Sequence, residues 1–477
     1  MRIRIAAITL CVWWGGAAWG QILPPAVTDA LTRSQVPLES VSVVVKEAGA
    51  KDAALSLNAD KAMNPASVMK LVTTYAGLEL LGPAHTWKTE VLIAGNMRGG
   101  TLHGDLVLKG FGDPKLSVER FWLLLKQLRE RGLTTIDGDL ILDRGFFENA
   151  PYDPAKFDGE PLRAYNVGPD ALLLNFKTVR FFFVPSVNDK SVSIAPDVRP
   201  AQLEIVNRVK LIDGPCGDWR ERVVANVQTP TPTTLKVSFS GNYPRRCGES
   251  VWNISLLDHA RFVGGVFANL WREVGGNWKG AVKLAATPAD ARLIATLESP
   301  PLADAIRDIN KFSNNVMARQ LFLTLSAELN KEPGSQIASA QIIREWLAKK
   351  NIPAPELILD NGAGLSRSER ISATTLAQLL EAAWKSSVMP EFMSSLALDG
   401  VDGTLRRRAR NEPVAGQAHI KTGTLNDVRA MAGFVLDASG RRWIVVMMIN
   451  HPNAPLAQAA QDALLSAIHG AAIASDR

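Results

Sequence analysis

The chain of 477 residues is too long for one ordinary domain, so we expect at least two hydrophobic cores. Its formal charge of +6 at pH 7 is mild for this length and identifies no partner by itself. The six histidines are scattered without paired spacing, and no basic stripe carries aromatic residues. These patterns predict no metal, no cofactor and no nucleic-acid partner.

The N-terminus has the pattern of a secretory signal peptide. A basic start precedes the apolar run Ile5–Trp14, which is too short to span a bilayer. Ala18 and Gly20 are the small residues expected before a cleavage site, so residues 1–20 should be removed. An uncleaved signal anchor is the alternative. No later stretch is long and apolar enough to span a membrane, so we expect an exported chain.

Two cysteines, Cys216 and Cys247, remain after the signal peptide is removed. In an oxidising compartment they predict one disulfide, worth about 3–4 kcal/mol to stability for a loop of roughly thirty residues. Two unpaired buried thiols are the alternative. Neither cysteine has the histidine context of a catalytic thiol.

The first predicted elements lead to a serine. Val41–Glu47 is typical of a strand, and Ala53–Leu57 is predicted to return as a second strand. A largely apolar helix is then predicted from Asn64 to the break at Gly82. Ser67 lies in its first turn.

Ser67 and Lys70 form an S-x-x-K pattern, which a sequence of this composition contains about once by chance. The helical context makes the pattern informative, because Lys70 at position i+3 lies on the same face, beside the hydroxyl. Burial in an apolar helix lowers the pKa of a lysine, so that it can accept the serine proton. A helix cap at Ser67 and a solvated charge at Lys70 are the alternative.

The region from residue 90 to 283 is strand-rich, with one amphipathic helix at Val118–Arg131. Two S-x-N triplets occur in it. Ser186–Asn188 is predicted to be a turn between strands. Ser240–Asn242 is predicted to be a hairpin turn after the strand Leu235–Phe239.

A third S-x-N triplet, Ser313-Asn314-Asn315, has a different context. It lies between two predicted helices, Leu302–Lys311 and Val316–Leu329. A polar wedge between buried helices is costly unless its groups face a cleft. We therefore predict a functional site at this triplet.

The triplet Lys421-Thr422-Gly423 lies in a predicted strand, Ile420–Leu425. Glycine weakens a strand interior, so Gly423 indicates that another group approaches the backbone closely. An ordinary edge strand is the alternative for the triplet taken alone. Two predicted strands and a helix follow: Arg429–Leu436, Arg442–Ile449 and Leu456–Ala472. Strands from both chain ends would then form one antiparallel sheet covered by helices.

With these three motifs in order, the chain resembles the class C low-molecular-mass penicillin-binding proteins. These are D-alanyl-D-alanine carboxypeptidase/endopeptidases of the bacterial envelope. The resemblance spans nearly the whole chain after the signal peptide. Further segments that carry it are Asn64–Thr74, Gly110–Pro114, Asn361–Arg367 and Gly400–Leu405. Ala363 departs from the serine that we expect the family to favour, a change that a loop tolerates.

The resemblance implies an α+β fold, in which a serine β-lactamase/penicillin-binding-like catalytic domain carries a long strand-rich insertion. Residues 21–89 and 284–477 would form the catalytic domain, and residues 90–283 the insertion. The polar stretch Asn175–Lys177 could divide the insertion into two small subdomains. The implied partners are peptidoglycan stem peptides and β-lactam antibiotics, and the implied compartment is the periplasm.

The resemblance also implies a role for each motif residue. Ser67 is the expected nucleophile and Lys70 its general base. Ser313 and Asn315 would complete the proton relay and hold the substrate's amide.

The Lys-Thr-Gly strand would bind the other end of the substrate. Lys421, with Thr422 or Thr424, would hold the terminal carboxylate, and Gly423 would allow the close approach. The backbone N–H groups of Ser67 and Thr424 would form the oxyanion hole.

An acidic residue of the insertion is expected, by the same resemblance, to hold the side-chain amine of the stem peptide. In the segment Asp153–Gly159 we favour Asp158, which follows the aromatic Phe157. A solvated loop aspartate is the alternative.

Three functions stay open at this point. We favour a serine D,D-peptidase. A β-lactamase or esterase acting on small substrates is the second, and the long insertion argues against it. A non-catalytic wall-binding protein of the same fold is the third, and the intact motif residues argue against it.

Overall fold

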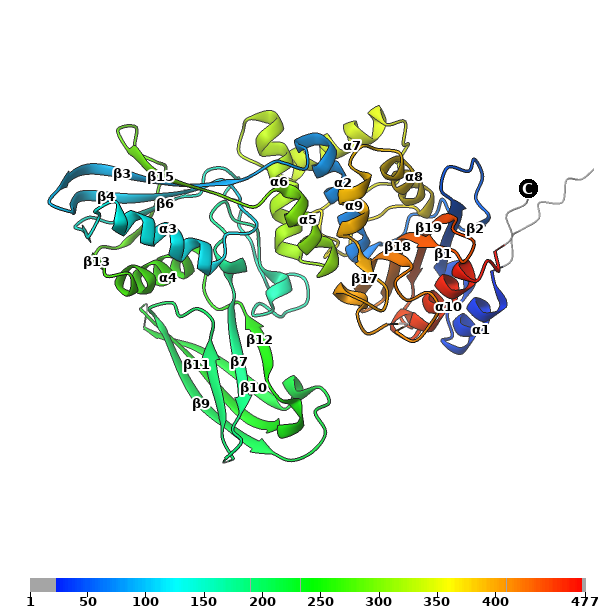
Figure 1. The fold of residues 1–477 in the computed structure, drawn as a ribbon, viewed down its shortest axis with the longest axis horizontal. Coiled ribbons are helices and arrows are strands. Elements are labelled where there is room, and N and C mark those ends of the chain that lie inside the picture. The colour runs from blue at the N-terminus through cyan, green and yellow to red at the C-terminus, as the bar shows by residue number, and fades with distance from the viewer. Residues whose placement is uncertain (1–22, 189, 232, 409, 474–477) are drawn as a thin grey trace, which may run out of the picture.

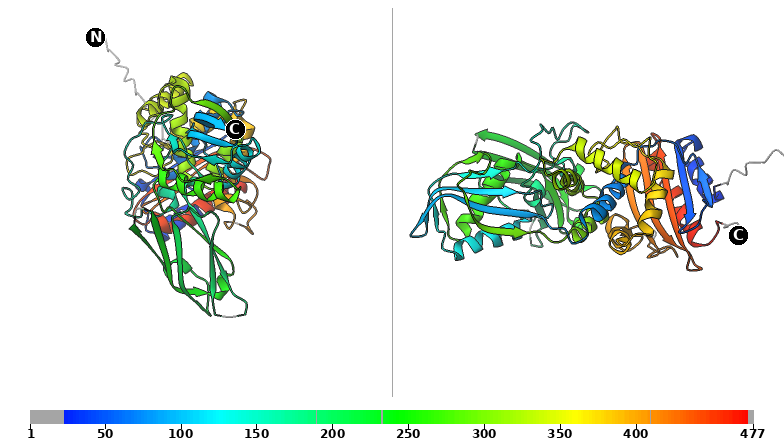
Figure 2. Two further views of the ribbon diagram at one scale, coloured as in Figure 1. Left: turned by 90° about the vertical axis from the view of Figure 1, so that its left-hand side faces the viewer. Right: turned by 90° about the horizontal axis from the view of Figure 1, so that it is seen from above.

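The fold is described from a computed structural model, which places residues 23–188, 190–231, 233–408 and 410–473 (Figure 1). The expected signal peptide lies outside the described residues. Residues 23–87 and 299–473, from both chain ends, form what we call the terminal unit, and residues 88–298 form the inserted unit. The two units lie next to each other along the long axis of the molecule (Figure 1, Figure 2). No helix in the described part of the chain has the length and apolar character needed to cross a membrane.

The terminal unit is built on an antiparallel sheet of order β16-β17-β18-β19-β1-β2. Its strands are β1 (Val41–Glu47), β2 (Leu55–Leu57), β16 (Ala397–Leu398), β17 (Ala418–Leu425), β18 (Val428–Leu436) and β19 (Arg442–Asn450). Strand β1 lies between β19 and β2, so both ends of the chain contribute to one sheet. This confirms the predicted arrangement.

Both faces of this sheet are buried, because successive side chains of its central strands alternate between two cores. Val43 and Met447 pack beneath α1 (Pro25–Arg33) and α10 (Gln458–His469). Val44 and Val446 pack into the larger core on the other face. The helices on that face are α2 (Lys70–Leu81), α5 (Leu302–Lys311), α6 (Asn315–Asn330), α7 (Gln336–Lys349), α8 (Ala373–Trp384) and α9 (Met389–Ser395) (Figure 1). A strand buried on both faces has an unbroken apolar run, as β19 has from Trp443 to Ile449.

The inserted unit contains a second sheet, of order β13-β5-β4-β3-β15, with β6 beside β4 and β14 beside β6. Its strands are β3 (Lys88–Arg98), β4 (Thr101–Gly110), β5 (Thr135–Ile136), β6 (Leu140–Asp143), β13 (Asn277–Trp278), β14 (Val282–Leu284) and β15 (Arg292–Glu298). Helices α3 (Val118–Glu130) and α4 (His259–Glu273) share its core. Because β15 pairs with β3, this sheet continues past residue 283, the border expected from the sequence.

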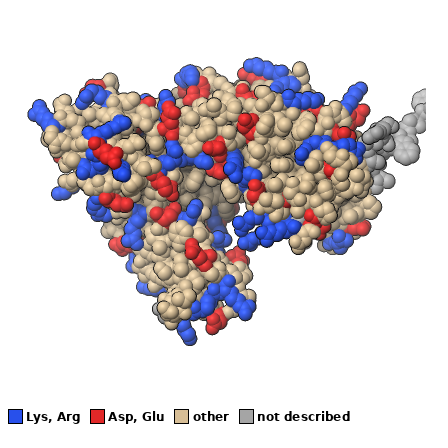
Figure 3. Space-filling model, in the orientation of Figure 1, with Lys and Arg blue, Asp and Glu red and all other residues tan. Residues whose placement is uncertain are grey.

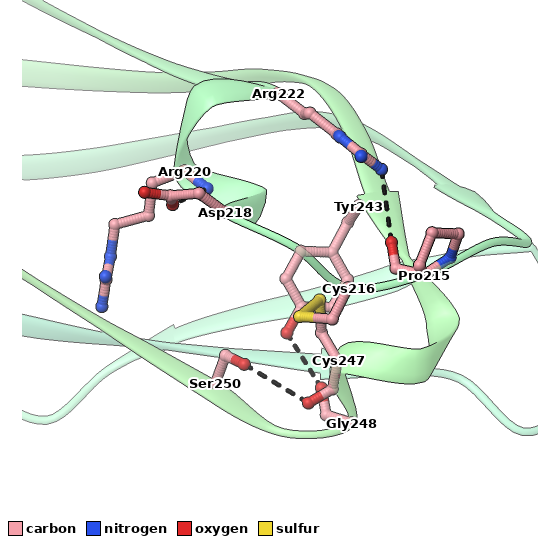
Figure 4. Close-up of a disulfide and its surroundings, with 9 residues drawn as sticks. All are labelled: Pro215, Cys216, Asp218, Arg220, Arg222, Tyr243, Cys247, Gly248 and Ser250. Atoms are coloured by element: carbon pink, nitrogen blue, oxygen red, sulfur yellow. Dashed lines mark hydrogen bonds between the residues drawn. A yellow bond between two sulfur atoms is a disulfide. The ribbon is translucent and has the colours of Figure 1, made fainter. Parts of the chain in front are cut away.

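Two smaller sheets project from the inserted unit, with the orders β10-β11-β9 and β12-β7-β8 (Figure 1). Their strands are β7 (Val179–Pro185), β8 (Val192–Pro196), β9 (Leu203–Ile212), β10 (Val223–Thr231), β11 (Thr234–Pro244) and β12 (Ser250–Ile254). The polar stretch Asn175–Lys177 forms a 3-10 turn directly before β7. Cys216 and Cys247 are joined in a disulfide, as predicted (Figure 4).

One predicted turn is wrong. Strand β11 continues through Ser240–Asn242, where the sequence predicts a hairpin turn. Gly241 pairs with Val223 of β10 on one side and with Val209 of β9 on the other. Partners on both sides satisfy the backbone N–H and C=O groups, which keeps this segment extended. Ser186–Asn188 does lie in the connection between β7 and β8, as predicted.

Candidate active site

The chain before Ser67 is held in a tight turn by Asn64. The Asn64 Oδ1 accepts a hydrogen bond from Ala66 N (2.9 Å), and its Nδ2 donates one to the Ser366 carbonyl (2.9 Å). Ala66 has a φ of 46°, in the left-handed region, which only surrounding contacts can stabilise in a non-glycine residue. This turn places Ser67 in a half-buried 3-10 turn, and Lys70 begins α2.

Lys70 is fully buried, and its Nζ has three oxygen neighbours. It lies 3.0 Å from Ser67 Oγ, 2.6 Å from Asn315 Oδ1 and 2.5 Å from the Ala363 carbonyl. The last two oxygens are carbonyl oxygens and can only accept, so in the neutral form of the amine they would bind both of its hydrogens. In that form the lone pair of the amine would be left for the Ser67 hydroxyl, as a general base requires.

The surroundings of Lys70 favour this neutral form. Burial lowers the pKa of Lys70 well below its ordinary value, and the positive charges of Lys421 and Arg319 lower it further. The carboxylate of Glu369 opposes them and raises it. Because burial is the largest of these effects, the amine is adapted to accept a proton.

Ser313 and Lys421 form the second half of the site. Ser313 connects α5 to α6 with a φ of 56°, a strained value for a serine. The Lys421 Nζ donates to Ser313 Oγ (2.9 Å) and to the Thr422 carbonyl (2.7 Å). Lys421 is fully buried, and burial lowers its pKa to about 7.

Strand β17 touches the backbone that carries Ser67. A Cβ atom at Gly423 would lie 2.4 Å from the Pro65 carbonyl and 3.1 Å from Ser67 N. The close approach expected at Gly423 is therefore to the backbone around the predicted nucleophile. Thr424, the next residue, consequently lies beside that backbone.

Asp158 lies in a loop of the inserted unit that contacts Asn315 through the Tyr165 carbonyl. Asn315 Nδ2 donates to the Tyr165 carbonyl (3.1 Å), and the Tyr165 hydroxyl donates to Asp158 Oδ2 (2.8 Å). Asn166 Nδ2 donates to Asp158 Oδ1 (2.7 Å). Desolvation raises the pKa of Asp158, but the hydrogen bonds from Tyr165 and Asn166 outweigh it and hold the pKa below its ordinary value. Asp158 is thus an exposed, ionised carboxylate two contacts from Asn315.

Two contributors to the site carry no signal in the sequence. Tyr165 offers its backbone carbonyl to Asn315, and a residue of any type has that group. Glu369 is fully buried, and its Oε1 accepts the N–H groups of residues 360–362 at 3.1–3.2 Å. These bonds fix the loop that presents the Ala363 carbonyl to Lys70. Because the backbone of Ala363 makes the contact, the family's serine is not required for it.

Comparison with known proteins gives the same family that the motifs indicate. The D-Ala-D-Ala carboxypeptidase 3 (S13) family matches residues 24–469. The chain is 25% identical over 424 residues to the D-alanyl-D-alanine carboxypeptidase DacB of Haemophilus influenzae, with 88% of this chain and 87% of the relative covered. It is 28% identical over 441 residues to the D-alanyl-D-alanine carboxypeptidase of an Actinomadura species, with 88% and 80% covered.

Among solved structures, penicillin binding protein 4 from Haemophilus influenzae has the same fold, with a TM-score of 0.75 and 24% identity. The match covers 93% of this chain and 99% of that protein. A predatory endopeptidase from Bdellovibrio bacteriovorus also shares the fold, with a TM-score of 0.53 and 15% identity. The expected α+β class, with a serine β-lactamase/penicillin-binding-like domain, is confirmed. Since the family match also includes the inserted unit and all three motifs, the chain belongs to the D-Ala-D-Ala carboxypeptidase 3 (S13) family.

Proposed function

We propose that this chain, a serine D,D-peptidase by family membership, acts on peptidoglycan stem peptides through an acyl-serine intermediate. It removes terminal D-alanine, cuts D-alanyl cross-links, or does both. The observation that carries the proposal is Lys70 Nζ, held between Ser67 Oγ and two carbonyl oxygens. The relatives named as D-alanyl-D-alanine carboxypeptidases support the substrate class.

In acylation, Lys70 takes the Ser67 proton while Ser67 Oγ attacks the carbonyl carbon of the scissile D-alanyl peptide bond. The carbonyl electrons move onto oxygen, where the N–H groups of Ser67 and Thr424 stabilise them, at about 3–4 kcal/mol for each donor. The C–N bond then breaks, and the leaving amine takes the proton held by Lys70 by way of the Ser313 hydroxyl, which returns Lys70 to its neutral form. Water gives a proton to Lys70 and attacks the ester carbonyl, and the adduct collapses as Lys70 returns that proton to Ser67 Oγ.

The remaining motif residues position these groups. Lys421 orients Ser313, and its positive charge adds to the effect of burial in lowering the pKa of Lys70. Asn315 holds the substrate's amide, and the hydroxyls of Thr422 and Thr424 bind the terminal carboxylate.

Incubation with two muropeptides, a monomeric pentapeptide and a cross-linked dimer, tests the proposal when the products are read by mass. Ser67→Ala should abolish turnover, and Lys70→Ala should cost nearly as much, because the two residues act as one unit. Ser240→Ala, in an unrelated S-x-N triplet, is the control and should keep full activity. Benzylpenicillin should add its mass to the peptide that contains Ser67.

Two results would replace the proposal. Turnover of penicillin without turnover of either muropeptide would indicate a β-lactamase. A folded chain that neither binds penicillin covalently nor cuts a muropeptide would indicate a wall-binding protein.

Asp158 is proposed to hold the side-chain ammonium of the diamino acid in the stem peptide. Its exposed, ionised carboxylate and its link to Asn315 through Tyr165 support this role. Phe157, whose ring lies 4.6 Å from the Arg367 guanidinium carbon, supplies an adjacent aromatic surface.

Asp158→Asn should lower kcat/KM by about 10- to 100-fold for stem peptides with a free side-chain amine, because a charged hydrogen bond is lost. Acylation by benzylpenicillin should stay almost unchanged, since penicillin has no such amine. Asp153→Asn in the same loop is the matched control. Equal losses on both substrates, or none on either, would mean that Asp158 does not bind the substrate and is a solvated loop residue.

The substrate class also implies a location. We propose that residues 1–20 direct export and that the chain works in the periplasm, where a disulfide persists.

A further inference from the structure

Lys421, the cation that the sequence predicts for the substrate carboxylate, already donates hydrogen bonds within the protein. Lys421 Nζ is fully buried and donates to Ser313 Oγ and to the Thr422 carbonyl. These two bonds use two of the three hydrogens of the Lys421 ammonium, so at most one is left for an incoming carboxylate. A carboxylate that leaves water for this end of the site nevertheless needs a positive partner.

Arg429 is a second cation at the same end of the site. It lies on β18 directly opposite Thr424 on β17, so the two side chains share one face of the sheet. Its Nη1 donates to Thr424 Oγ1 at 2.7 Å. Thr422, two residues earlier on β17, belongs to the same face, and its Oγ1 lies 3.1 Å from Thr404 Oγ1. Hydroxyl donors and a guanidinium therefore gather at the edge where the terminal carboxylate is proposed to bind.

The charge of Arg429 has no counterion within the described part of the chain. No acidic side chain there forms an ion pair with it, and its Nε is buried without a hydrogen-bond partner. Burial, and then the nearby Arg408 guanidinium, lower the pKa of Arg429. An arginine still remains protonated, so a half-buried cation is left without an anion. A bound anion would compensate this charge.

The surface around the site also favours anions. Lysine and arginine side chains gather on the terminal unit where it borders the hollow between the two units (Figure 3). Clustered charges of one sign raise the local concentration of oppositely charged ligands.

We propose that Arg429 is a specificity-determining residue that pairs with the C-terminal carboxylate of the substrate, with Thr424 hydrogen-bonded beside it. This assignment rests on the proposed function, because peptides ending in D-alanine and β-lactams share that carboxylate. The guanidinium has five N–H donors in a planar fork that matches a carboxylate, and one of them is used by Thr424. Arg429 thus binds the carboxylate, while Lys421 holds Ser313.

The test compares benzylpenicillin with its methyl ester, which lacks the negative charge, as acylating agents for Ser67. Arg429→Gln should lower the second-order acylation rate constant for the free acid by about 10- to 100-fold. The rate constant for the ester should stay within about twofold of the unaltered enzyme, because its carbonyl chemistry is unchanged. Arg429→Lys keeps the charge and should recover part of the loss. Arg442→Gln, an arginine at the far end of the same sheet, should leave the ratio of free acid to ester unchanged.

Each other outcome would overturn the assignment. Equal losses for acid and ester in Arg429→Gln would mean that the arginine only supports the fold of β17, and no loss for either would mean a solvated charge. A loss for the acid that Arg429→Lys does not relieve would reject charge pairing as the cause. Failure of the unaltered chain to react with benzylpenicillin would instead reject the proposed function, so the two failures are distinguishable.

Discussion

Glu369 illustrates how one buried charge sets both chemistry and stability at the scale of single residues. Its Oε1 fixes residues 360–362, and its charge raises the pKa of Lys70. Burial in turn raises the pKa of Glu369 to about 7. Its Oε2 is buried without a hydrogen-bond partner, so a glutamine in this position would keep every existing bond.

Glu369→Gln should move the acid limb of the pH–acylation profile to lower pH. A general base must be unprotonated, so acylation falls as the pH drops through the pKa of Lys70. Glu369 carries its negative charge mainly above its pKa of about 7. Removing that charge lowers the pKa of Lys70 in that range, so acylation near pH 7 should rise by roughly two- to tenfold and acylation at acidic pH should change little. Glu356→Gln, which replaces a carboxylate bonded to Thr375, is the control and should leave the limb in place. A limb displaced to higher pH would contradict the charge assignment.

The same variant should also change how stability depends on pH. Between pH 4.5 and 7 the folded chain binds the Glu369 proton more tightly than the unfolded chain, so stability falls as the pH rises. Glutamine does not titrate, so Glu369→Gln should remove this loss of stability with rising pH. The measurement is the free energy of unfolding of both chains in denaturant at pH 4 and pH 8. Between these pH values the unaltered chain should lose on the order of 2–3 kcal/mol more than the variant.

At the scale of elements, the disulfide fastens the projecting sheets independently of the active site. Cys216 follows β9, and Cys247 lies in the turn after β11. Beside it, the Tyr243 hydroxyl donates to the Gly248 carbonyl (2.9 Å) (Figure 4). The bond thus connects two strands that already pair in parallel.

Replacing both cysteines by serine should destabilise these sheets and leave catalysis intact. The disulfide spans 31 residues, and closing such a loop in the unfolded chain contributes about 3–4 kcal/mol. Hydrogen exchange followed by mass spectrometry should show faster exchange in β9 and β11 but not in β17 to β19. Acylation of Ser67 by penicillin serves as the internal control, and a clear loss of acylation would contradict the independence of the two regions.

At the scale of the whole molecule, helix α6 joins the inserted unit to the catalytic centre. Its first residue, Asn315, bonds to Lys70 and to the Tyr165 carbonyl. One turn further on, Gln320 accepts a hydrogen bond from Asp170 N and donates to the carbonyls of Asp170 and Gly112. The loop that carries Asp158 is therefore positioned by the same helix that carries Asn315.

Gln320→Leu should weaken this junction at nearly constant volume. Loss of three buried hydrogen bonds should lower the free energy of unfolding by roughly 2–4 kcal/mol. Because the loop would move relative to Asn315, kcat/KM for stem peptides should fall by about tenfold or more, and more than penicillin acylation. Gln341→Leu on the exposed face of α7 is the matched control. Equal losses on both substrates would indicate that the junction supports the reaction centre as a whole.

The sequence by itself determined the elements and residues whose signals are local. Val41–Glu47 and Leu302–Lys311 have the predicted bounds, because side-chain periodicity within one segment decides them. The three motifs and the cysteine pair are also local patterns, and the structure brings each motif to the site. Gly423 predicted that some group approaches the backbone closely, but the sequence did not predict that this group is the backbone of Pro65 and Ser67.

Only the tertiary structure decided what depends on partners distant in the chain. Gly241 is extended because β9 and β10 flank it, although Ser-Gly-Asn alone favours a turn. Glu369 and Arg429 are ordinary charged residues in the sequence, and their roles arise from burial and from neighbours that folding supplies. The free energy of a buried charge depends on its surroundings in three dimensions, which no local pattern of residues specifies.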